Sequence, residues 1–487
     1  MGKGKRDLSR VPHHTKIVAT LGPASSEDEI LEHMIRVGLD VVRMNFSHGT
    51  AEFHQDNADK VRRASERAGR EVAIIADLQG PKIRVGKIVG GKFTVAEGEE
   101  LVFDAELTGE GSRDAVGLDY RELPHDVAPG DVLLLDDGAL TVIVKEVIGS
   151  KIVTIVQNDA VLKSNKGINK QGGGLSAAAL TPKDYEDLKT AVALGADYLA
   201  ISFVKSAADM ELARQLVAQA AGTSGHRPGL IAKIERKEAI DNLEEILKAS
   251  DGVMVARGDL AVEVGNAAVP ALQKKIIRMA RKMGRFTITA TQMMESMIVS
   301  PMPTRAEVSD VANAVLDGSD AVMLSAETAV GAYAFETIRT MATICNAAEE
   351  AQDISHEEEE MLIRRTQRVD HAIASGAVFT ARQMGAKAIV ALTESGTTAF
   401  QISRYNINVP IYALTASIAV QRKMAIYRAV RPMIFDSNKE SQQAIREVKE
   451  YLAFRGIMES GDVFVITSGM NMGEPGSTNT LQICRAK

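Results

Sequence analysis

The sequence predicts an α/β fold: a (β/α)₈ barrel with a small β-barrel domain inserted in it and a second α/β domain after it. Three observations predict this fold. Eight short apolar runs, each followed by a polar or glycine-containing stop and a stretch with helical spacing, recur over residues 15–350. A segment of short Val/Ile runs with glycine turns interrupts them, and a new strand-and-helix pattern begins after about residue 351. Alternating strands and helices are typical of a parallel sheet, and eight such units close into a barrel.

The eight predicted strands are almost continuous in Val, Ile, Leu and Ala, as strands buried on both faces require. They begin at Thr15, Asp40, Glu71, Ala196, Leu230, Asp251, Phe286 and Ser319. The helices between them also have sequence signals. Ser26 and Glu29, for example, have the spacing of a capping box, and the helix that they would begin is expected to end at Gly38.

The third strand ends near Asp77, but the fourth begins only near Ala196, so a separate small domain is expected between them. Gly80 and Pro81 would form its hinge. A charged stretch, DISHEEEEMLIRR, indicates another boundary after about Ala351. The predicted domains are an N-terminal extension (1–13), the barrel (14–82 and 178–350), the inserted β lid (83–177) and the C-terminal α/β domain (351–487).

Length and composition exclude several classes of protein. A chain of 487 residues is too long for one ordinary domain, and its 45% hydrophobic and 25% charged residues are typical of globular proteins. A net charge of -7 argues against nucleic acid or an anionic membrane as partners. Two cysteines, Cys345 and Cys484, are too few for a disulfide framework or a thiolate metal site. No apolar segment has the length of a signal peptide or a membrane span, so we expect a cytoplasmic protein.

Charged side chains occur where the predicted barrel strands end. In barrel enzymes the catalytic groups lie at this C-terminal face. Side chains two apart on a strand share a face. We therefore expect Arg43 to line up with Asn45 and Ser47, Lys233 with Glu235, and Arg257 with Asp259. Because charges that are costly to bury lie near one another here, Lys233 is predicted to be catalytic rather than an ion-paired surface lysine.

Glu235 and Asp259 are predicted to be metal ligands. They are hard oxygen donors from neighbouring strands, and no histidine or cysteine cluster competes with them, so magnesium or manganese is favoured over zinc. Two protein ligands would leave coordination positions for a substrate. The alternative is that the two carboxylates only form ion pairs with Lys233 and Arg257.

Six segments, taken in order along the chain, resemble the signature segments of pyruvate kinase. They are VVRMNFSHG, ADLQGPKIR, IAKIER, MVARGDL, TATQMMESM and DAVMLSAETA. The resemblance spans nearly the whole length and includes a β domain inserted after the third barrel strand. It implies magnesium-dependent phosphoryl transfer from phosphoenolpyruvate to ADP, giving pyruvate and ATP. It also implies a homotetramer.

The resemblance also implies roles for single residues. In the family, the lysine at Lys233 neutralises the phosphoryl group during transfer, the arginine at Arg43 holds the same phosphate, and Thr291 assists protonation of the enolate. The substrate would also contact Gly258, Asp259, Ser325 and Glu327. ADP would lie under a closing lid, in contact with Asn45, His48, Arg84 and Lys166. Asp136 and Asp137, in LLDDG, are candidates for turn residues.

One departure from the family concerns potassium. Many members bind potassium beside the substrate phosphate, and the resemblance places that pocket at Asn45, Ser47, Asp77 and Leu78. Those members read GPEIR where this chain reads GPKIR. Lys82 therefore supplies an ammonium where they have a carboxylate. Because this cation can replace the electrostatic effect of the ion, we predict activity without potassium.

The segment TESGTTAFQISRY predicts an effector site between a strand and a helix of the C-terminal domain. Its candidate ligands are Thr393, Ser395, Gly396, Thr397 and Thr398. Hydroxyls and backbone amides at a helix start suit an anion, and the family binds phosphorylated effectors in this segment. An ordinary capped helix is the alternative. Glu394 disfavours a doubly phosphorylated sugar, so a sugar monophosphate or nucleotide monophosphate is predicted as activator.

Two other functions remain possible from the residues alone. A magnesium-dependent barrel lyase that forms pyruvate enolate would need similar charges, but neither a nucleotide lid nor Lys166. A catalytically silent metabolite sensor is disfavoured because the four residues expected at the centre are all intact. They are Lys233, Glu235, Asp259 and Thr291.

Overall fold

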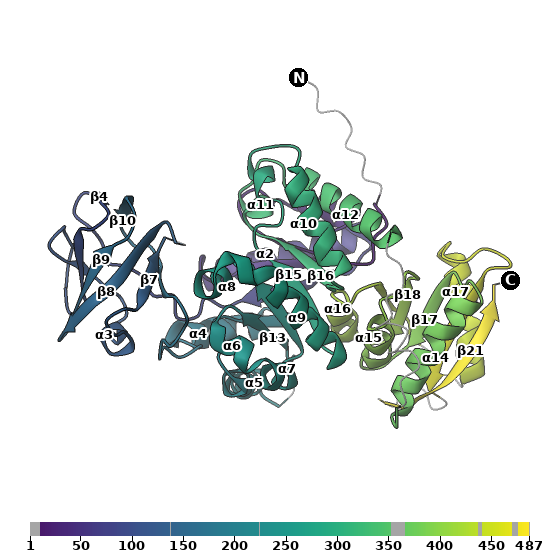
Figure 1. Cartoon of the computed structure of the whole chain (residues 1–487). Coiled ribbons are helices and arrows are strands. Elements are labelled where there is room, and N and C mark those ends of the chain that lie inside the picture. Colours follow the sequence, from purple (N-terminus) through teal and green to yellow (C-terminus); the bar gives the residue numbers. More distant parts are fainter. Residues whose placement is uncertain are drawn as a thin grey trace, which may run out of the picture.

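The computed structural model describes residues 10–136, 138–223, 225–351, 366–436, 441–469 and 476–486. A closed barrel forms the centre of the molecule, with a β domain on one side and an α/β domain on the other (Figure 1). This arrangement confirms the predicted fold class. The sequence-based expectations for residues 1–9, for Asp137 and for the charged stretch at 352–365 lie outside the described residues.

The barrel consists of eight parallel strands in the closed order β1-β16-β15-β14-β13-β12-β3-β2. Their bounds are β1 (Lys16–Thr20), β2 (Val41–Asn45), β3 (Ala73–Asp77), β12 (Tyr198–Ile201), β13 (Gly229–Ile234), β14 (Gly252–Ala256), β15 (Phe286–Ala290) and β16 (Ala321–Leu324). Each of the eight predicted runs contains one strand, apart from the fifth, where β13 begins one residue before its run. Because all eight point the same way, their C-terminal ends meet at one mouth.

Helices cover the outside of the barrel (Figure 1). They are α1 (Asp28–Val37), α2 (Ala51–Ala68), α4 (Pro182–Ala193), α5 (Ala207–Ala221), α6 (Lys237–Asp241), α7 (Leu243–Ala249), α8 (Arg257–Val264), α9 (Val269–Lys282), α10 (Arg305–Leu316), α11 (Ala326–Ala329) and α12 (Ala334–Glu350), with short 3₁₀ turns at Asn266–Ala268 and Glu295–Ile298. None of the described helices has the length and apolar character needed to cross a membrane.

The predicted capping box at the start of α1 is wrong. The N-cap of α1 is Glu27, and its side chain makes no capping hydrogen bond. The amide of Ser26 already donates to Gly22 O at 3.1 Å in the preceding turn, so it is not available for Glu29. The C-terminal end was predicted correctly, because Gly38 follows the last residue of the helix.

The inserted domain, called the lid below, is a curled β structure with its own core. A six-stranded sheet has the order β11-β7-β8-β9-β5-β6, and β10 pairs with β4. The bounds are β4 (Lys92–Val95), β5 (Glu100–Asp104), β6 (Val116–Gly117), α3 (Leu123–Asp126), β7 (Val132–Leu135), β8 (Leu140–Ile148), β9 (Lys151–Val156), β10 (Ala160–Lys163) and β11 (Ile168–Lys170). The core runs from Ile83 to Leu175, which supports the predicted boundaries of 83–177. Those boundaries stay a prediction.

The chain connects the barrel to the lid twice, and glycines with positive φ occur at both connections. Gly80, in the predicted hinge, has φ 67°. Gly172, Gly173 and Gly174 have φ between 80° and 90°. The positive φ of Gly173 favours glycine, and a Cβ there would lie 2.7 Å from Glu238 Oε2. The sequence reasoning identified the first connection and missed the second.

The C-terminal domain is a five-stranded sheet in the order β19-β18-β17-β20-β21. Its elements are α14 (Val369–Gln383), β17 (Ala388–Leu392), α15 (Thr397–Ser403), β18 (Ile411–Thr415), α16 (Ile418–Met424), β19 (Val430–Ile434), α17 (Ser441–Phe454), β20 (Val463–Gly469) and β21 (Thr478–Arg485). This sheet confirms the second strand-and-helix pattern that the sequence predicts after the barrel. Only β21 is antiparallel to its neighbour.

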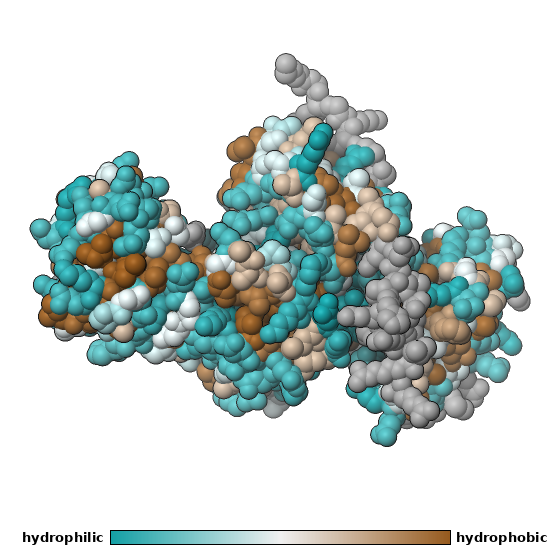
Figure 2. All heavy atoms as spheres, in the orientation of Figure 1, coloured by the Kyte–Doolittle hydropathy of each residue, from teal (hydrophilic) through white to brown (hydrophobic). Residues whose placement is uncertain are grey.

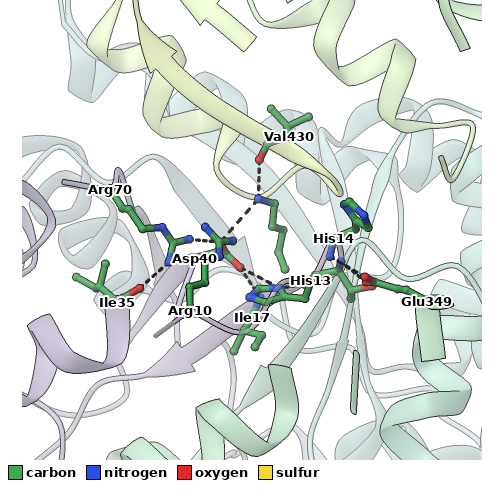
Figure 3. Close-up of polar contacts among 11 residues, drawn as sticks. Arg10, His13, His14, Ile17, Ile35, Asp40, Arg70, Glu349 and Val430 are labelled. Atoms are coloured by element: carbon green, nitrogen blue, oxygen red, sulfur yellow. Dashed lines mark hydrogen bonds and ion pairs between the residues drawn. The ribbon is translucent and has the colours of Figure 1, made fainter. Parts of the chain in front are cut away.

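The C-terminal domain packs against the barrel at the N-terminal ends of the strands, opposite the mouth. Ala425 and Ile426 belong to the same apolar cluster as the inward-facing barrel residues. Beside this contact lies a buried charge cluster around Asp40 (Figure 3). Asp40 Oδ1 lies 2.9 Å from Arg70 Nη2 and 3.7 Å from Lys16 Nζ. Lys16 also donates to Val430 O at 2.6 Å and so links the two domains.

Candidate active site

Lys233, on β13, places its ammonium group among oxygen atoms from three neighbouring strand ends. Its Nζ lies 2.9 Å from Glu235 Oε1, 2.7 Å from Ser202 Oγ and 3.3 Å from Asp77 Oδ1. Burial disfavours the charged form, but the carboxylates of Asp77 and Glu235 outweigh burial and raise the pKa of Lys233 above its usual range. Lys233 therefore stays positively charged at the mouth of the barrel.

Arg43, on β2, lies next to Lys233 because both bind the same carboxylate. Arg43 Nε donates to Asp77 Oδ2 at 2.6 Å, and Nη1 donates to Thr20 Oγ1 at 3.0 Å. Burial raises the pKa of Asp77, but Lys233 and Arg43 together lower it below its usual value. Asp77 thus holds two cations side by side.

Glu235 and Asp259 supply the carboxylates that were predicted to bind a metal. Glu235 is 1% exposed, and its Oε2 accepts a hydrogen bond from Phe203 N at 2.6 Å. Burial, with a further contribution from the nearby charge of Asp259, raises the pKa of Glu235. Within the described residues, the side chain of Asp259 has no hydrogen-bond or ion-pair partner. The two like charges would be stabilised by a cation.

The expectation that Arg257 and Asp259 share one face of a strand is wrong. Strand β14 ends at Ala256, and both residues lie in the first turn of α8. The guanidinium of Arg257 points to Asp310 on α10, with contacts of 2.7 and 2.8 Å. Asp259 is therefore not neutralised by Arg257, so the alternative in which both carboxylates only form ion pairs applies to Glu235 alone.

Thr291 follows β15 in a strained turn. Thr291 and Gln292 have φ of 69° and 53°, which is unusual for residues other than glycine, and most of all for a β-branched one. Thr291 Oγ1 accepts a hydrogen bond from Gly258 N at 2.8 Å, so the backbone amide that was expected to help bind substrate is held by Thr291 here. Arg257 supports the turn by donating to Thr291 O at 2.6 Å. Strain of this kind is typical of functional sites.

A cleft of about 590 Å³ lies between the lid and the part of the mouth that carries Asp259 and Thr291. Asp259, Thr291 and Lys82 line it from the barrel side, and Leu134 and Gln171 line it from the lid. The mouth and the lid therefore enclose one space. Such a space suits a small, highly charged substrate that must be shielded from water.

Two family models match most of the chain. The model described as pyruvate kinase, barrel domain, matches residues 12–338, and the model described as pyruvate kinase, alpha/beta domain, matches residues 371–484. The chain belongs to the pyruvate kinase family. Members of this family transfer a phosphoryl group between phosphoenolpyruvate and ADP, generally with magnesium, and this is the function of the chain. Neither the lyase nor the silent sensor is supported.

Individual relatives agree with this assignment. Pyruvate kinase II of Salmonella typhimurium is 48% identical over 98% of this chain and 99% of its own length. Pyruvate kinase of Mycobacterium tuberculosis is 42% identical over 96% of this chain and 98% of its own length. The crystal structure of a pyruvate kinase from Cryptosporidium parvum superimposes with a TM-score of 0.91 at 34% identity, covering 98% of this chain and 96% of that one.

In this member of the pyruvate kinase family, oxygens of the expected potassium pocket already have partners. Asn45 Oδ1 accepts from Ser47 N at 3.1 Å, and Leu78 O accepts from Ser202 Oγ at 2.7 Å. The carboxylate of Asp77 holds two cations, as described above. Lys82 is exposed and lines the neighbouring cleft.

The residues expected to bind ADP lie in two pairs. Asn45 and His48 are at the end of β2, and the side chain of His48 is exposed. Arg84 and Lys166 are at the base of the lid, where Arg84 forms a β-bridge with Gly167. Lys166 Nζ forms an ion pair with Asp136 Oδ1 at 2.7 Å. Among the described residues, no hydrogen bond or ion pair joins the two pairs.

Ser325 and Glu327 follow β16 at the mouth. Glu327 is 2% exposed; its Oε2 accepts from Ser325 N at 2.6 Å and its Oε1 from Met294 N at 3.4 Å. Glu327 therefore positions the loops after β15 and β16. Its direct contact with substrate stays a prediction.

Only part of the predicted effector segment is open to a ligand. Ser395 and Thr397 are exposed, and their hydroxyl oxygens lie 2.9 Å apart. Thr393 is buried and accepts from Gly396 N at 2.9 Å. Thr398 is also buried, and its hydroxyl lies 2.7 Å from that of Thr478 on β21.

Sequence reasoning missed two contributors to the site. Ser202 bonds Lys233 and follows β12 directly, so the rule that strand ends carry functional groups could have identified it. Asp310 holds Arg257 from 53 residues further along the chain, and no local pattern signals that pairing.

Proposed function

We propose that Lys233 and Arg43, with a divalent cation on Glu235 and Asp259, carry the phosphoryl transfer from phosphoenolpyruvate to ADP in this chain. The observation that carries the proposal is the position of the Lys233 ammonium, 2.9 Å from Glu235 Oε1 and beside the cation of Arg43. Charge that develops on a transferring phosphoryl group is best stabilised by cations that are already fixed in place. Removing one such group typically costs about 3 to 4 kcal/mol of barrier.

The donors fit magnesium or manganese. Glu235 is a buried carboxylate with a raised pKa, and Asp259 is a carboxylate that has no hydrogen-bond or ion-pair partner among the described residues. No group of three or more His, Cys, Asp or Glu side chains suited to a metal occurs in the described part of the chain, so substrate and water would complete the coordination. When bound there, the ion would act as a Lewis acid toward the phosphate and the enolate oxygen.

The protein side chains have separate tasks in this proposal. Arg43 binds the phosphate, and Lys233, whose raised pKa keeps it protonated, stabilises negative charge rather than releasing a proton. Thr291 orients the turn near the carbon that is protonated. Lys166 and Arg84 would reach ADP when the lid closes, which requires the Lys166–Asp136 ion pair to exchange for nucleotide phosphate. Closure would exclude water, which competes with ADP as acceptor.

Replacement of Lys233 tests the proposal. Lys233→Met should lower kcat at least about a hundredfold, because it removes a fixed positive charge without adding bulk. The measurement is pyruvate release coupled to ADP and phosphoenolpyruvate with saturating magnesium. Lys248→Met is a matched control, since Lys248 is 65% exposed and lies on the outer helix α7. If Lys233→Met kept more than a tenth of the wild-type kcat, the assignment would be wrong.

We infer that Lys82 makes the chain independent of potassium. The support is its position on the cleft and the existing partners of Asn45 and Leu78. The initial rate should be the same with and without potassium in sodium-free tetramethylammonium buffer. Lys82→Glu, which introduces the carboxylate of the potassium-binding family members, should introduce a potassium requirement. A tenfold rise for the wild type on adding potassium would contradict the inference.

We infer that a sugar monophosphate or nucleotide monophosphate activates the enzyme at Ser395 and Thr397, the two exposed hydroxyls of the segment. The phosphoenolpyruvate concentration that gives half-maximal rate should fall when ribose 5-phosphate, glucose 6-phosphate or AMP is added. A double Ser395→Ala, Thr397→Ala variant should lose that shift. Unchanged wild-type curves with all three compounds would remove the idea.

We infer that the chain forms a homotetramer in the cytoplasm. Val299, Met302 and Val330 are 80%, 73% and 61% exposed, and apolar side chains lie among polar ones in the region of α10 and α11 (Figure 2). Apolar side chains grouped in this way are typical of protein interfaces. Sedimentation analysis should give four copies, and Met302→Asp should lower that number. A wild-type monomer would contradict the inference.

A further inference from the structure

The loop at residues 45–49 carries several of the groups assigned above, yet its shape depends on contacts from outside it. Asn45 and His48 are the proposed nucleotide ligands on the barrel side. Two carbonyl groups of this loop accept hydrogen bonds from side chains elsewhere. Lys183 Nζ, from α4, donates to Phe46 O at 2.7 Å. His54, from α2, lies 2.9 Å from His48 O through Nε2.

His54 has the geometry of a support for this loop. It is 3% exposed, and its ring stacks on the ring of Phe46 with centroids 3.9 Å apart and planes 8° from parallel. A carbonyl oxygen can only accept, so Nε2 must carry the proton. Nδ1 is buried without a hydrogen-bond partner, which fits the neutral form of the ring. One side chain therefore fixes both the ring of Phe46 and the backbone of His48.

The backbone of the loop needs such support. Gly49 has φ 87°, and a Cβ there would lie 2.6 Å from the ring of Phe53, so the turn into α2 is tight. Helix α2 begins directly after it, with Thr50 as N-cap. Without the bond from His54, the carbonyl of His48 would have no hydrogen-bond partner among the residues that the structure describes. The loop would then have more than one accessible conformation.

We propose that His54 is a positioning residue for the nucleotide: by holding His48 O and Phe46 it fixes the loop at 45–49 in the conformation that binds ADP. This inference rests on the proposed nucleotide site. His54 does not itself touch the reacting groups. Because it acts on the nucleotide side of the mouth, its loss should affect ADP and leave phosphoenolpyruvate unaffected.

Two substitutions of His54 separate positioning from packing. His54→Phe keeps a ring that can stack on Phe46 but removes the donor. His54→Gln loses the ring but can place an amide donor near the position of Nε2. For His54→Phe we expect KM for ADP to rise about tenfold, as loss of one buried hydrogen bond suggests, with KM for phosphoenolpyruvate within about twofold. For His54→Gln we expect KM for ADP within about threefold of the wild type.

The controls identify which assumption fails. Lys166→Met tests the nucleotide site itself: if it leaves KM for ADP unchanged, the proposed function of the site is wrong. If Lys166→Met raises KM for ADP and a folded His54→Phe does not, the role of His54 is wrong. An equal rise of both KM values in His54→Phe would also overturn it. Should His54→Phe not fold, Lys183→Met removes the other support of the loop, and an unchanged KM for ADP there would count against the proposal.

Discussion

Two buried charge clusters lie at opposite ends of the barrel strands and differ in what they leave for a ligand. At the junction with the C-terminal domain, both oxygens of Asp40 have partners: Oδ1 contacts Arg10, Lys16 and Arg70, and Oδ2 accepts from Ile17 N at 3.2 Å. At the mouth, Asp77 and Glu235 neutralise Arg43 and Lys233, while Asp259 has no partner in the described part of the chain.

The difference separates structural charge from functional charge. At the junction the carboxylate of Asp40 is neutralised by cations of the described residues, and Lys16 and Val430 connect the C-terminal domain to the barrel. The mouth has one carboxylate in excess of its central cations, and it opens into a cleft. In (β/α)₈ barrels one end of the strands generally serves stability and the other catalysis, and here the neutralisation of the carboxylates distinguishes the two ends.

The largest expected effect is on stability at the junction. Asp40→Asn leaves three cations without a carboxylate and should lower the free energy of unfolding by about 3 to 5 kcal/mol. The turnover of the folded fraction should change little. Urea unfolding measures the first quantity, and kcat per active site measures the second. A large loss of kcat in a fully folded Asp40→Asn protein would remove the distinction between the two ends.

At the mouth the opposite outcome is expected. Asp259→Asn should lower kcat about a hundredfold to a thousandfold, while the melting temperature should not fall, because the change removes a like charge beside Glu235. Asp56→Asn is a suitable control, since Asp56 is 60% exposed on the outer helix α2. Clear destabilisation by Asp259→Asn would show that the mouth also serves to stabilise the fold.

The junction should also respond to acid. Burial lowers the pKa of His13 to about 4, partly offset by Asp40, while Arg10 and Lys16 lower it further. Since the ordinary value is 6.5, the unfolded chain takes up the proton first, and stability is lost as pH falls from about 6.5 to 4. The loss should approach about 3 kcal/mol. As pH falls, the free energy of unfolding should therefore decrease less steeply in His13→Asn than in the wild type. Equal slopes in the two proteins would contradict this explanation.

The smallest effect concerns metal binding without turnover. At ten times its dissociation constant, magnesium should stabilise the folded protein by about 1.4 kcal/mol and raise the melting temperature slightly. The shift should disappear in Asp259→Asn and persist in Asp40→Asn if that variant is folded. An equal shift in all three proteins would place the metal elsewhere.

Patterns within short stretches of sequence predicted most of the fold. All eight barrel strands, the inserted domain and the five strands of the last domain could be derived from apolar runs and turn residues, because each such signal is local. The capping box at Ser26 was misjudged because a preceding turn had already engaged the amide of that residue. The second lid connection, at 172–174, was missed because a run of glycines does not reveal that Glu238 packs against it.

At the site, residue types were easier to predict than side-chain directions. Lys233, Glu235 and Arg43 meet as the strand-end rule implies. Arg257 was misplaced because the strand stops one residue before it and a helix begins, which turns the side chain toward Asp310. Such a change of direction depends on packing between α8 and α10, which the sequence does not display.

The two glycine connections of the lid determine how it can move. A rigid body joined at two places rotates readily about the line between them, whereas sliding or twisting would stretch one connection. Gly80 at one connection and Gly172, Gly173 and Gly174 at the other permit that rotation. In the lid closure proposed above, such a rotation would carry Lys166 toward the mouth along a single path.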